Sequence, residues 1–257
     1  MDAAWPAAER HEAGAWVLRA ASGVTQRTNS VWPRWETDST WSALSIPGTG
    51  TGQDRLASLR EARLWYRSRR LPLIFQVFDG PRHAALNAVL DDEGFTRQSE
   101  TVILERRGTA APPADSGVHI LDEPSDEWLG LWWGVDGRGG DTEMGVARDI
   151  LTGCPSLYAL VRDDDGMPAA VGRLALAGRQ GGLYCMATRQ DARRRGYAMR
   201  VLHSLLAAGA ARGLTGYWLL VMASNTGARG LYREAGFQEA GRYIYRQERP
   251  RRHLTGC

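Results

Sequence analysis

The sequence contains no lysine, only three cysteines and no long uninterrupted hydrophobic run. All 32 basic side chains are arginine, and because arginine occurs on every kind of segment, this reflects a GC-rich coding sequence rather than a particular chemistry. Cys154, Cys185 and Cys257 are widely spaced and form no CxxC or Cys/His pair, which argues against a zinc site or a redox dithiol. We therefore expect free thiols and no bound metal.

No stretch approaches the roughly 18 apolar residues that a membrane-spanning helix needs. The first six residues lack the basic start and apolar run of a signal peptide. The formal net charge of +3 is too small an excess for a nucleic-acid-binding protein. We expect a cytoplasmic protein, a monomer or a homodimer, that acts neither on nucleic acid nor at a membrane.

At 257 residues the chain is longer than one typical domain. Residues 108–116 are rich in proline, alanine and glycine, show no apolar periodicity and lie between two strand-like runs. This composition predicts a linker between an N-terminal domain over residues 1–110 and a C-terminal domain over residues 117–257.

Apolar periodicity and turn residues divide the C-terminal half into alternating elements. The predicted strands cover residues 118–121, 157–162, 169–177, 183–188, 217–221 and 242–247, and the predicted helices cover residues 126–133, 142–151, 196–212 and about 225–235. Gly213 and Gly236 stand where a helix would end in a left-handed residue.

The two halves of the sequence resemble each other at a constant offset of 142 residues. The matched features are helical patterns at residues 54–70 and 196–212, strand-like runs at 73–77 and near 217, Gly94-Phe95 with Gly236-Phe237, and closing strands at 101–104 and 243–246. Because helix, strand, helix, stop and closing strand share one offset, we predict a tandem duplication.

An arginine- and glycine-containing segment leads into the predicted helix at 196–212 and includes its first three residues. The segment consists of Arg193, Arg194, Arg195, Gly196, Tyr197 and Ala198. Backbone N–H groups at a helix start have no intrahelical partner and the helix dipole is positive there, so such a turn can bind a pyrophosphate. Gly196 and Ala198 keep the approach open, and the arginines add positive charge.

A second motif follows the next predicted strand. It has the form N-x-x-A-x-x-L-Y-x-x-x-G-F and consists of Asn225, Ala228, Leu231, Tyr232, Gly236 and Phe237. Together with the R/Q-x-x-G-x-G/A turn, it makes residues 188–237 resemble the GNAT (GCN5-related N-acetyltransferase) superfamily. This resemblance implies an α/β (α+β) fold of two GNAT-like domains, each a mixed, mostly antiparallel sheet flanked by helices, with a splayed pair of strands in the C-terminal domain.

The resemblance also implies site residues. The backbone of Met186, Ala187 and Thr188 would bind the pantetheine and the acetyl carbonyl of acetyl-CoA, and residues 193–198 would bind its pyrophosphate. A bulge in the strand that ends at Thr188 would free the backbone groups required. Tyr232 would be the general acid for the departing thiolate, although it also fits an apolar helix face. Asn225 is either a cofactor contact or a helix N-cap.

The general base is not identified from the sequence. Many GNAT proteins carry a glutamate on the splayed strand, but residues 183–188 of this chain contain no carboxylate. Glu127, Asp141, Glu143 and Asp149 lie on the first two predicted helices, where a carboxylate is usually solvated. Trp128, Trp132 and Trp133 on the first of these helices either line an acceptor pocket or belong to the core. Cys185 is expected in the core.

The first half has lost the chemistry of the second. At the 142-residue offset, Gly196 corresponds to Asp54, Asn225 to His83 and Tyr232 to Leu90. A carboxylate in place of Gly196 would repel a pyrophosphate. We predict a degenerate N-terminal copy, with the glycine-rich residues 48–52 in a loop.

The sequence thus predicts an enzyme that transfers an acetyl group from acetyl-CoA directly to a primary amine of a small molecule or a peptide. One alternative is a non-catalytic acyl-CoA sensor or scaffold, which the missing glutamate favours and Asn225 and Tyr232 disfavour. Another is an aminoacyl-tRNA-dependent transferase, which would need a strong basic patch and no pyrophosphate loop. The acceptor amine is not identified from the sequence.

Overall fold

The computed structural model describes residues 1–14, 16–33, 52–108, 110, 112–137 and 139–249. Packing divides the chain into two units. Unit 1 comprises residues 1–6 and 101–241, and unit 2 comprises residues 7–100 and 242–257. Neither unit is contiguous in sequence. Two of the three boundaries between them fall within long strands, β5 (Thr96–Arg107) and β11 (Gln238–Gln247), and the third follows Pro6.

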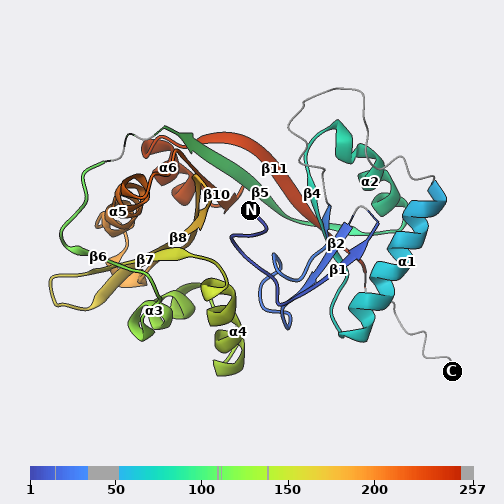
Figure 1. Cartoon of the computed structure of the whole chain (residues 1–257), viewed down its shortest axis with the longest axis horizontal. Coiled ribbons are helices and arrows are strands. Elements are labelled where there is room, and N and C mark those ends of the chain that lie inside the picture. The colour runs from blue at the N-terminus through green and yellow to red at the C-terminus, as the bar shows by residue number, and fades with distance from the viewer. Residues whose placement is uncertain (15, 34–51, 109, 111, 138, 250–257) are drawn as a thin grey trace. The chain divides into compact units, whose positions relative to one another are not determined.

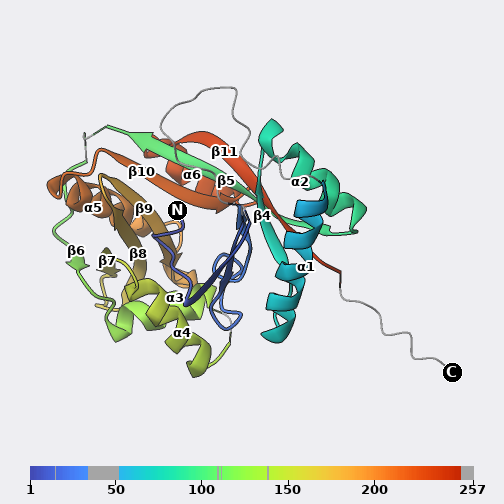
Figure 2. The same cartoon turned by 45° about the vertical axis from the view of Figure 1, so that its right-hand side comes forward.

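Unit 1 is a twisted sheet between two layers of helices. Its elements are β6 (Val118–Leu121), α3 (Asp126–Asp136), α4 (Asp141–Thr152), β7 (Ser156–Arg162), β8 (Pro168–Ala177), β9 (Gln180–Thr188), the short 3-10 helix η1 (Gln190–Ala192), α5 (Tyr197–Ala211), β10 (Gly216–Met222) and α6 (Thr226–Glu234). Helices α5 and α6 lie on one face of the sheet, and α3 and α4 lie on the other (Figures 1 and 2). Each element predicted for the C-terminal half is confirmed, with ends shifted by a few residues.

The strand order in unit 1 is β5-β10-β9-β8-β7-β6. All neighbours are antiparallel except β9 and β10, which are parallel. The sheet is therefore mixed and mostly antiparallel, as predicted.

Helix α5 supplies the centre of the unit 1 core because its apolar residues recur at helical spacing. Val201, Leu202, Leu205 and Leu206 are almost fully buried against the sheet. Each buried leucine or valine contributes about 1.5–3 kcal/mol relative to an exposed one. This packing fixes the axis of α5, and hence the position of its N-terminus.

Unit 2 contains the N-terminal copy. Its elements are β1 (Glu9–Ala13), β2 (Trp16–Ala20), β3 (Trp32–Pro33), α1 (Gly52–Ser68), β4 (Ile74–Phe78), α2 (Pro81–Asp92) and residues 242–247 of β11. Strands β1, β2 and β3 form a small antiparallel sheet, and β4 pairs antiparallel with β11. Leu59, Tyr66, Phe75 and Leu90 are fully buried in its core.

The predicted repeat is confirmed in the secondary structure. Strands β4 and β10 begin 142 residues apart, and so do β5 and β11. Each helix is followed, two residues after its last, by a left-handed glycine: Gly94 (φ 75°) after α2 and Gly236 (φ 85°) after α6. In both copies the next phenylalanine donates its N–H back to the helix, Phe95 to the Leu90 carbonyl at 2.9 Å and Phe237 to the Tyr232 carbonyl at 3.0 Å.

The closing strands are exchanged between the units, which the sequence did not predict. Residues 101–107 of β5 come from the N-terminal half of the chain but pair with β10 in unit 1. Residues 243–247 of β11 come from the C-terminal half but pair with β4 in unit 2. The predicted contiguous domains, 1–110 and 117–257, stay a prediction about the two copies of the repeat.

Two predicted segments differ from the structure. Gly52, expected in a loop, begins α1, and the other residues of the glycine-rich segment lie outside the described ranges. The predicted strand at residues 101–104 is the buried middle of the longer β5, whose flanking residues are half-buried or exposed and therefore gave no apolar signal. None of the helices in the described ranges is long and apolar enough to cross a membrane.

Candidate active site

The parallel strands β9 and β10 form a fork. They pair only where Gly216 to Leu219 lie beside Gln180 to Leu183. Strand β9 continues to Thr188 and β10 to Met222, but these later residues are not in register with each other. The splayed pair predicted for the C-terminal half is therefore present.

Strand β9 carries a bulge just beyond the fork point. Ala187 is opposite Val171 on β8 and Tyr184 is opposite Arg173, so β9 has one more residue than β8 in this interval. Cys185 lies in the bulge with φ 53° and is half-buried, rather than in the core as expected. A bulge disrupts the ladder locally and re-aims backbone groups. Met186, Ala187 and Thr188 directly follow it.

The loop after β9 presents a row of backbone N–H groups. Arg194 has φ 63°, and Gly196, the N-cap of α5, has φ 82°. Within the part of the chain that the structure describes, the N–H groups of residues 194–198 have no backbone or side-chain acceptor. Successive N–H groups in such a turn, at a positive helix end, form an anion-binding concavity. We call residues 193–198 the cradle.

The space at the cradle is open. A Cβ added to Gly196 would meet no atom within 4 Å. Its positive φ still favours glycine, because L-residues pay a steric cost there. The Tyr197 side chain is buried in the core of unit 1 and only 5% exposed, so this residue can offer a ligand its backbone alone.

The three cradle arginines are exposed and differ in their contacts. Arg195 donates from Nη2 to Asp164 Oδ2 at 3.0 Å and lies 5.3 Å from the Tyr197 ring centroid. Arg193 Nε is 3.4 Å from the Thr188 carbonyl oxygen. Arg194 makes no side-chain hydrogen bond or ion pair with the residues described. Its guanidinium is available to an anion.

Tyr232 projects from α6 into the core of unit 1. It is 8% exposed and packs edge-on against Phe237, with 6.1 Å between ring centroids. Its hydroxyl has no hydrogen-bond partner among the described residues, and burial raises the pKa of Tyr232 to about 12. The side chain is therefore a neutral O–H donor throughout the physiological pH range.

Asn225 is the N-cap of α6. Its Oδ1 accepts a hydrogen bond from the Ala228 N–H at 3.0 Å. Of the two roles left open by the sequence, the capping role is therefore present. A cofactor contact through its side-chain amide nitrogen stays a prediction.

The open end of the fork, the cradle and the start of α6 lie at one edge of the sheet. Thr188 ends β9 and leads into the cradle, and Met222 ends β10 and leads into α6. The carboxyl ends of adjacent parallel strands lie together, and ligands of α/β sheets bind at such edges. Met186, Ala187, Thr188, the cradle and Asn225 therefore lie near one end of the β9–β10 pair, whereas Tyr232 lies further along α6 in the core of unit 1.

The acidic residues of α3 and α4 are ion-paired, capping or exposed. Glu127 accepts two hydrogen bonds from Arg162, and that guanidinium holds the pKa of Glu127 below its usual value. Glu143 accepts the Gly140 N–H at 2.8 Å and so caps α4. Asp141 and Asp149 are exposed. A base working near neutral pH needs a raised carboxyl pKa, which burial without a cation would give.

The tryptophans of α3 divide between core and surface. Trp128 is fully buried and donates from Nε1 to the carbonyls of Ala159 at 3.0 Å and Gly172 at 3.2 Å. Trp132 is also buried, and Trp133 is half-buried. Trp128 and Trp132 thus belong to the core. For Trp133, a contact with the acceptor stays a prediction.

Residues 1–6 complete unit 1, which no sequence pattern indicated. The Trp5 ring stacks on Tyr184 with 5.2 Å between centroids. The fully buried Arg173 donates to the Ala4 carbonyl at 3.0 Å and to Cys154 Sγ at 3.0 Å. Because Tyr184 immediately precedes the bulge, the N-terminal segment buttresses β9 beside the candidate site.

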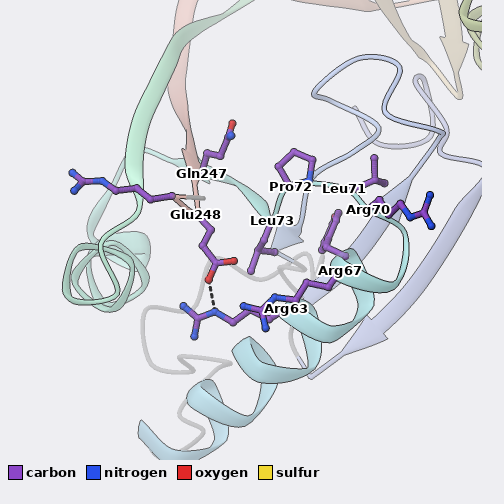
Figure 3. A pocket seen from close by; sticks show the side chains of 10 residues that line it. Arg63, Arg67, Arg70, Leu71, Pro72, Leu73, Gln247 and Glu248 are labelled. Atoms are coloured by element: carbon purple, nitrogen blue, oxygen red, sulfur yellow. Dashed lines mark hydrogen bonds and ion pairs between the residues drawn. The ribbon is translucent and has the colours of Figure 1, made fainter. Parts of the chain in front are cut away.

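A hollow of about 510 Å³ in unit 2 is a different feature (Figure 3). Its lining includes Arg63, Arg67, Arg70 and Arg249, and Arg63 Nε donates to Glu248 Oε1 at 2.6 Å. The hollow adjoins the C-terminal end of α1, whereas the cradle adjoins the N-terminal end of α5, the repeat counterpart of α1. The hollow is therefore not a second cradle.

The repeat counterparts of the chemical residues support the predicted loss. Leu90 stands where the second copy has Tyr232 and is fully buried. His83, the counterpart of Asn225, is 6% exposed. Asp54 lies in α1, and its side chain is outside the description. No group of three or more potential metal ligands was found among the described residues.

Comparison with known proteins agrees with this geometry. A family model described as "Probable histone acetyltransferase Rv0428c C-terminal" matches residues 1–246. The chain is 25% identical over 254 residues to the uncharacterized N-acetyltransferase YobR of Bacillus subtilis (strain 168), a match that covers 96% of this chain and 95% of that protein. It is 38% identical over 175 residues to a mycothiol acetyltransferase of Clavibacter michiganensis, covering 62% of this chain and 56% of that protein.

Solved structures show the same fold at low identity. A GCN5-related N-acetyltransferase from Sphaerobacter thermophilus superposes with a TM-score of 0.61 at 18% identity, covering 79% of this chain and 70% of that one. A tandem GNAT protein from the clavulanic acid biosynthesis pathway superposes with a TM-score of 0.64 at 13% identity, covering 79% of this chain and 73% of that one. With its fork, its cradle and a family match over nearly its whole length, the chain belongs to the GNAT superfamily of N-acetyltransferases.

Proposed function

We propose that the chain transfers an acetyl group from acetyl-CoA directly to a primary amine, and that unit 1 carries out this reaction. The observation that carries the proposal is the row of unpaired N–H groups at residues 194–198, directly beyond an open strand fork. Acetyl-CoA would supply a thioester-activated acetyl group. The protein's part is to hold both reactants in reacting geometry, which can contribute about 7–11 kcal/mol.

The residues present fit this co-substrate. The cradle offers N–H donors, a positive helix end and the unpaired Arg194 to a diphosphate. The fork leaves the β10-facing edge of Met186, Ala187 and Thr188 to an extended chain such as pantetheine. Arg193, Arg195, Tyr197 and Ala198 complete the cradle, and Asn225 would add a contact from the start of α6.

Tyr232 would donate a hydrogen bond to the departing sulfur. With a pKa of about 12, its phenol is a weaker acid than a thiol of ordinary pKa near 8.5. Full proton transfer to a free thiolate would therefore be uphill, so the hydrogen bond has to strengthen as the carbon–sulfur bond breaks. A buried O–H with no other partner suits this role.

The acceptor nitrogen must be neutral to attack. An amine with the lysine-like pKa of about 10.4 is about 3 units from neutrality at pH 7, a cost of about 4–5 kcal/mol. No protein base is assigned, because the candidate carboxylates are ion-paired, capping or exposed. We propose that the acceptor loses this proton to solvent before it reacts.

A panel of amines tests this function. The names of the relatives point to different acceptors, so the panel should include amino acids, polyamines, aminoglycosides and lysine-containing peptides. We expect release of free coenzyme A thiol with at least one class. For accepted amines, log(kcat/KM) should rise with pH with unit slope up to the pKa of each amine. A common inflection near pH 7 for amines of different pKa would instead reveal a protein base.

Replacing Tyr232 tests its role. Tyr232→Phe removes no intramolecular hydrogen bond in the described structure, so we expect an unchanged thermal midpoint, an unchanged Kd for coenzyme A and a kcat lower by about 10²-fold or more. The decrease should be the same at pH 7 and pH 9.5, because the phenol does not ionise in that interval.

Tyr217→Phe is the matched control. The Tyr217 hydroxyl donates to the Leu206 carbonyl at 2.9 Å, so this variant should lose stability and keep its kcat. Unchanged turnover in Tyr232→Phe would remove Tyr232 from the reaction and leave it a core residue.

A further inference from the structure

The turn between β7 and β8 contacts the loop that connects β9 to α5 and contains most of the cradle. It contains three consecutive aspartates, Asp163, Asp164 and Asp165, which we call the acidic hairpin. Two of its carboxylates form ion pairs with arginines of residues 189–196, the segment that connects β9 to α5. The two contacts differ in burial and in what they hold.

Asp163 holds the start of this loop through an ion pair with Arg189. Its side chain is 4% exposed and accepts hydrogen bonds from the N–H groups of Asp165 at 3.1 Å and Met167 at 2.9 Å, and from Arg189 Nη2 at 2.5 Å. The bond from Arg189 holds the pKa of Asp163 below its usual value, so the carboxylate is ionised at neutral pH.

Arg189, the first residue after β9, is fixed by several further bonds. Its Nε donates to Asp191 at 2.6 Å, its Nη1 to the Pro168 carbonyl at 2.8 Å, and its backbone N–H to the Ala169 carbonyl at 2.9 Å. The residue that begins the turn towards the cradle is thus tied to the acidic hairpin and to β8.

Asp164 makes a contact of the opposite kind. Its carboxylate is 90% exposed and lies 3.0 Å from Arg195 Nη2 in the cradle itself. A carboxylate and a phosphate oxygen are alternative acceptors for one guanidinium. The neighbouring Arg194 has no such partner in the described structure. Asp164 therefore occupies one N–H donor of a cradle arginine.

We propose that the acidic hairpin sets the affinity for the coenzyme through two opposed contacts: Asp163 is a positioning residue that holds the cradle through Arg189, and Asp164 competes with the diphosphate for Arg195. The proposal rests on the proposed function, because it takes the cradle as the diphosphate site. It makes the three adjacent aspartates unequal.

The expected effects have different signs. Asp164→Asn removes a competing charge from an exposed pair, so coenzyme A should bind about two- to five-fold more tightly. Asp163→Asn weakens the brace by replacing a charge-assisted bond with a neutral one, so coenzyme A should bind at least about three-fold more weakly. Asp165→Asn changes the same charge on the same turn, but the Asp165 side chain has no ion pair with the loop in the described structure, so it should change little.

Calorimetric titration of coenzyme A into the full-length wild type and the three variants tests the proposal. We expect the order Asp164→Asn tightest, wild type and Asp165→Asn equal, and Asp163→Asn weakest. In turnover assays the KM for acetyl-CoA should follow this order, whereas kcat and the KM for the acceptor stay constant. A tighter complex cannot result from structural damage, so Asp164→Asn separates the proposal from a merely structural role.

The outcomes separate two failures. No binding by the wild type would overturn the proposed function together with this inference. Binding by the wild type, with Asp164→Asn no tighter than Asp165→Asn, would overturn the inference alone. If Asp163→Asn does not fold, the comparison of Asp164→Asn with Asp165→Asn decides the proposal.

Discussion

A chain shortened to residues 117–257 is expected neither to unfold cooperatively nor to bind coenzyme A. It would lack residues 101–107 of β5, which pair along the whole of β10 in unit 1. Val102 and Leu104 on that strand are buried in the same core as α5. Losing them would leave β10 as an exposed apolar edge, which favours aggregation over folding. Circular dichroism during thermal unfolding would measure the effect.

A matched control keeps every strand. A protease site placed within residues 108–116 would cut the chain without removing β5 or the segment 1–6, so the cleaved protein should stay associated and keep its coenzyme A affinity. Residues 1–116 expressed together with residues 117–257 should behave alike. A shortened chain that unfolds cooperatively and binds coenzyme A would show that the contiguous domain is sufficient, and that the strand exchange is dispensable.

Gly196→Glu is expected to abolish coenzyme A binding, with Kd raised by more than about 10²-fold. The substitution places a carboxylate among N–H groups that would otherwise meet a diphosphate, and like charges repel strongly at contact distance. It also forces a side chain onto φ 82°, at a cost of about 1–2 kcal/mol of stability. Calorimetry with coenzyme A would measure the affinity, and thermal unfolding the stability.

Gly213→Glu separates the two effects. Gly213 follows the opposite end of α5 with φ 80°, and a Cβ there also meets nothing within 4 Å. The two variants should therefore lose similar stability, while only Gly196→Glu loses coenzyme A binding. Equal affinities in the two variants would mean that the N-terminus of α5 does not hold the diphosphate.

The sequence was sufficient where the chemistry is local. The cradle is six consecutive residues beside a strongly periodic helix, so the turn and its glycine could be located from the sequence, and the resemblance of residues 188–237 to GNAT proteins gave the turn its expected role. The helix ends before Phe95 and Phe237 were also predictable. A left-handed glycine and a phenylalanine whose N–H bonds back to the helix depend only on neighbouring residues in the chain.

Which neighbour each closing strand pairs with could not be predicted from the sequence. The alternation in β5 and β11 predicts a strand and its buried face, but it does not say which neighbour the strand joins. Both copies offer similar edges, β4 and β10, so the exchange depends on long-range packing. The contacts of Trp5 with Tyr184 and of Asp163 with Arg189 are long-range for the same reason.

The missing base has a physical explanation in the described structure. Residues 183–188 of the splayed strand include no carboxylate, and the acidic residues Glu127, Asp141, Glu143 and Asp149 of α3 and α4 are ion-paired, capping or exposed. If the acceptor loses its proton to solvent, as proposed, activity at neutral pH should favour amines of low pKa. The acceptor panel measures this preference directly.

A crystal structure of the full chain with coenzyme A tests the central claim most directly. The account predicts one coenzyme per chain, with its diphosphate oxygens within hydrogen-bond distance of the N–H groups of residues 194–198 and its pantetheine between β9 and β10. A diphosphate seated at the start of α1, or a coenzyme bound away from the fork, would contradict it.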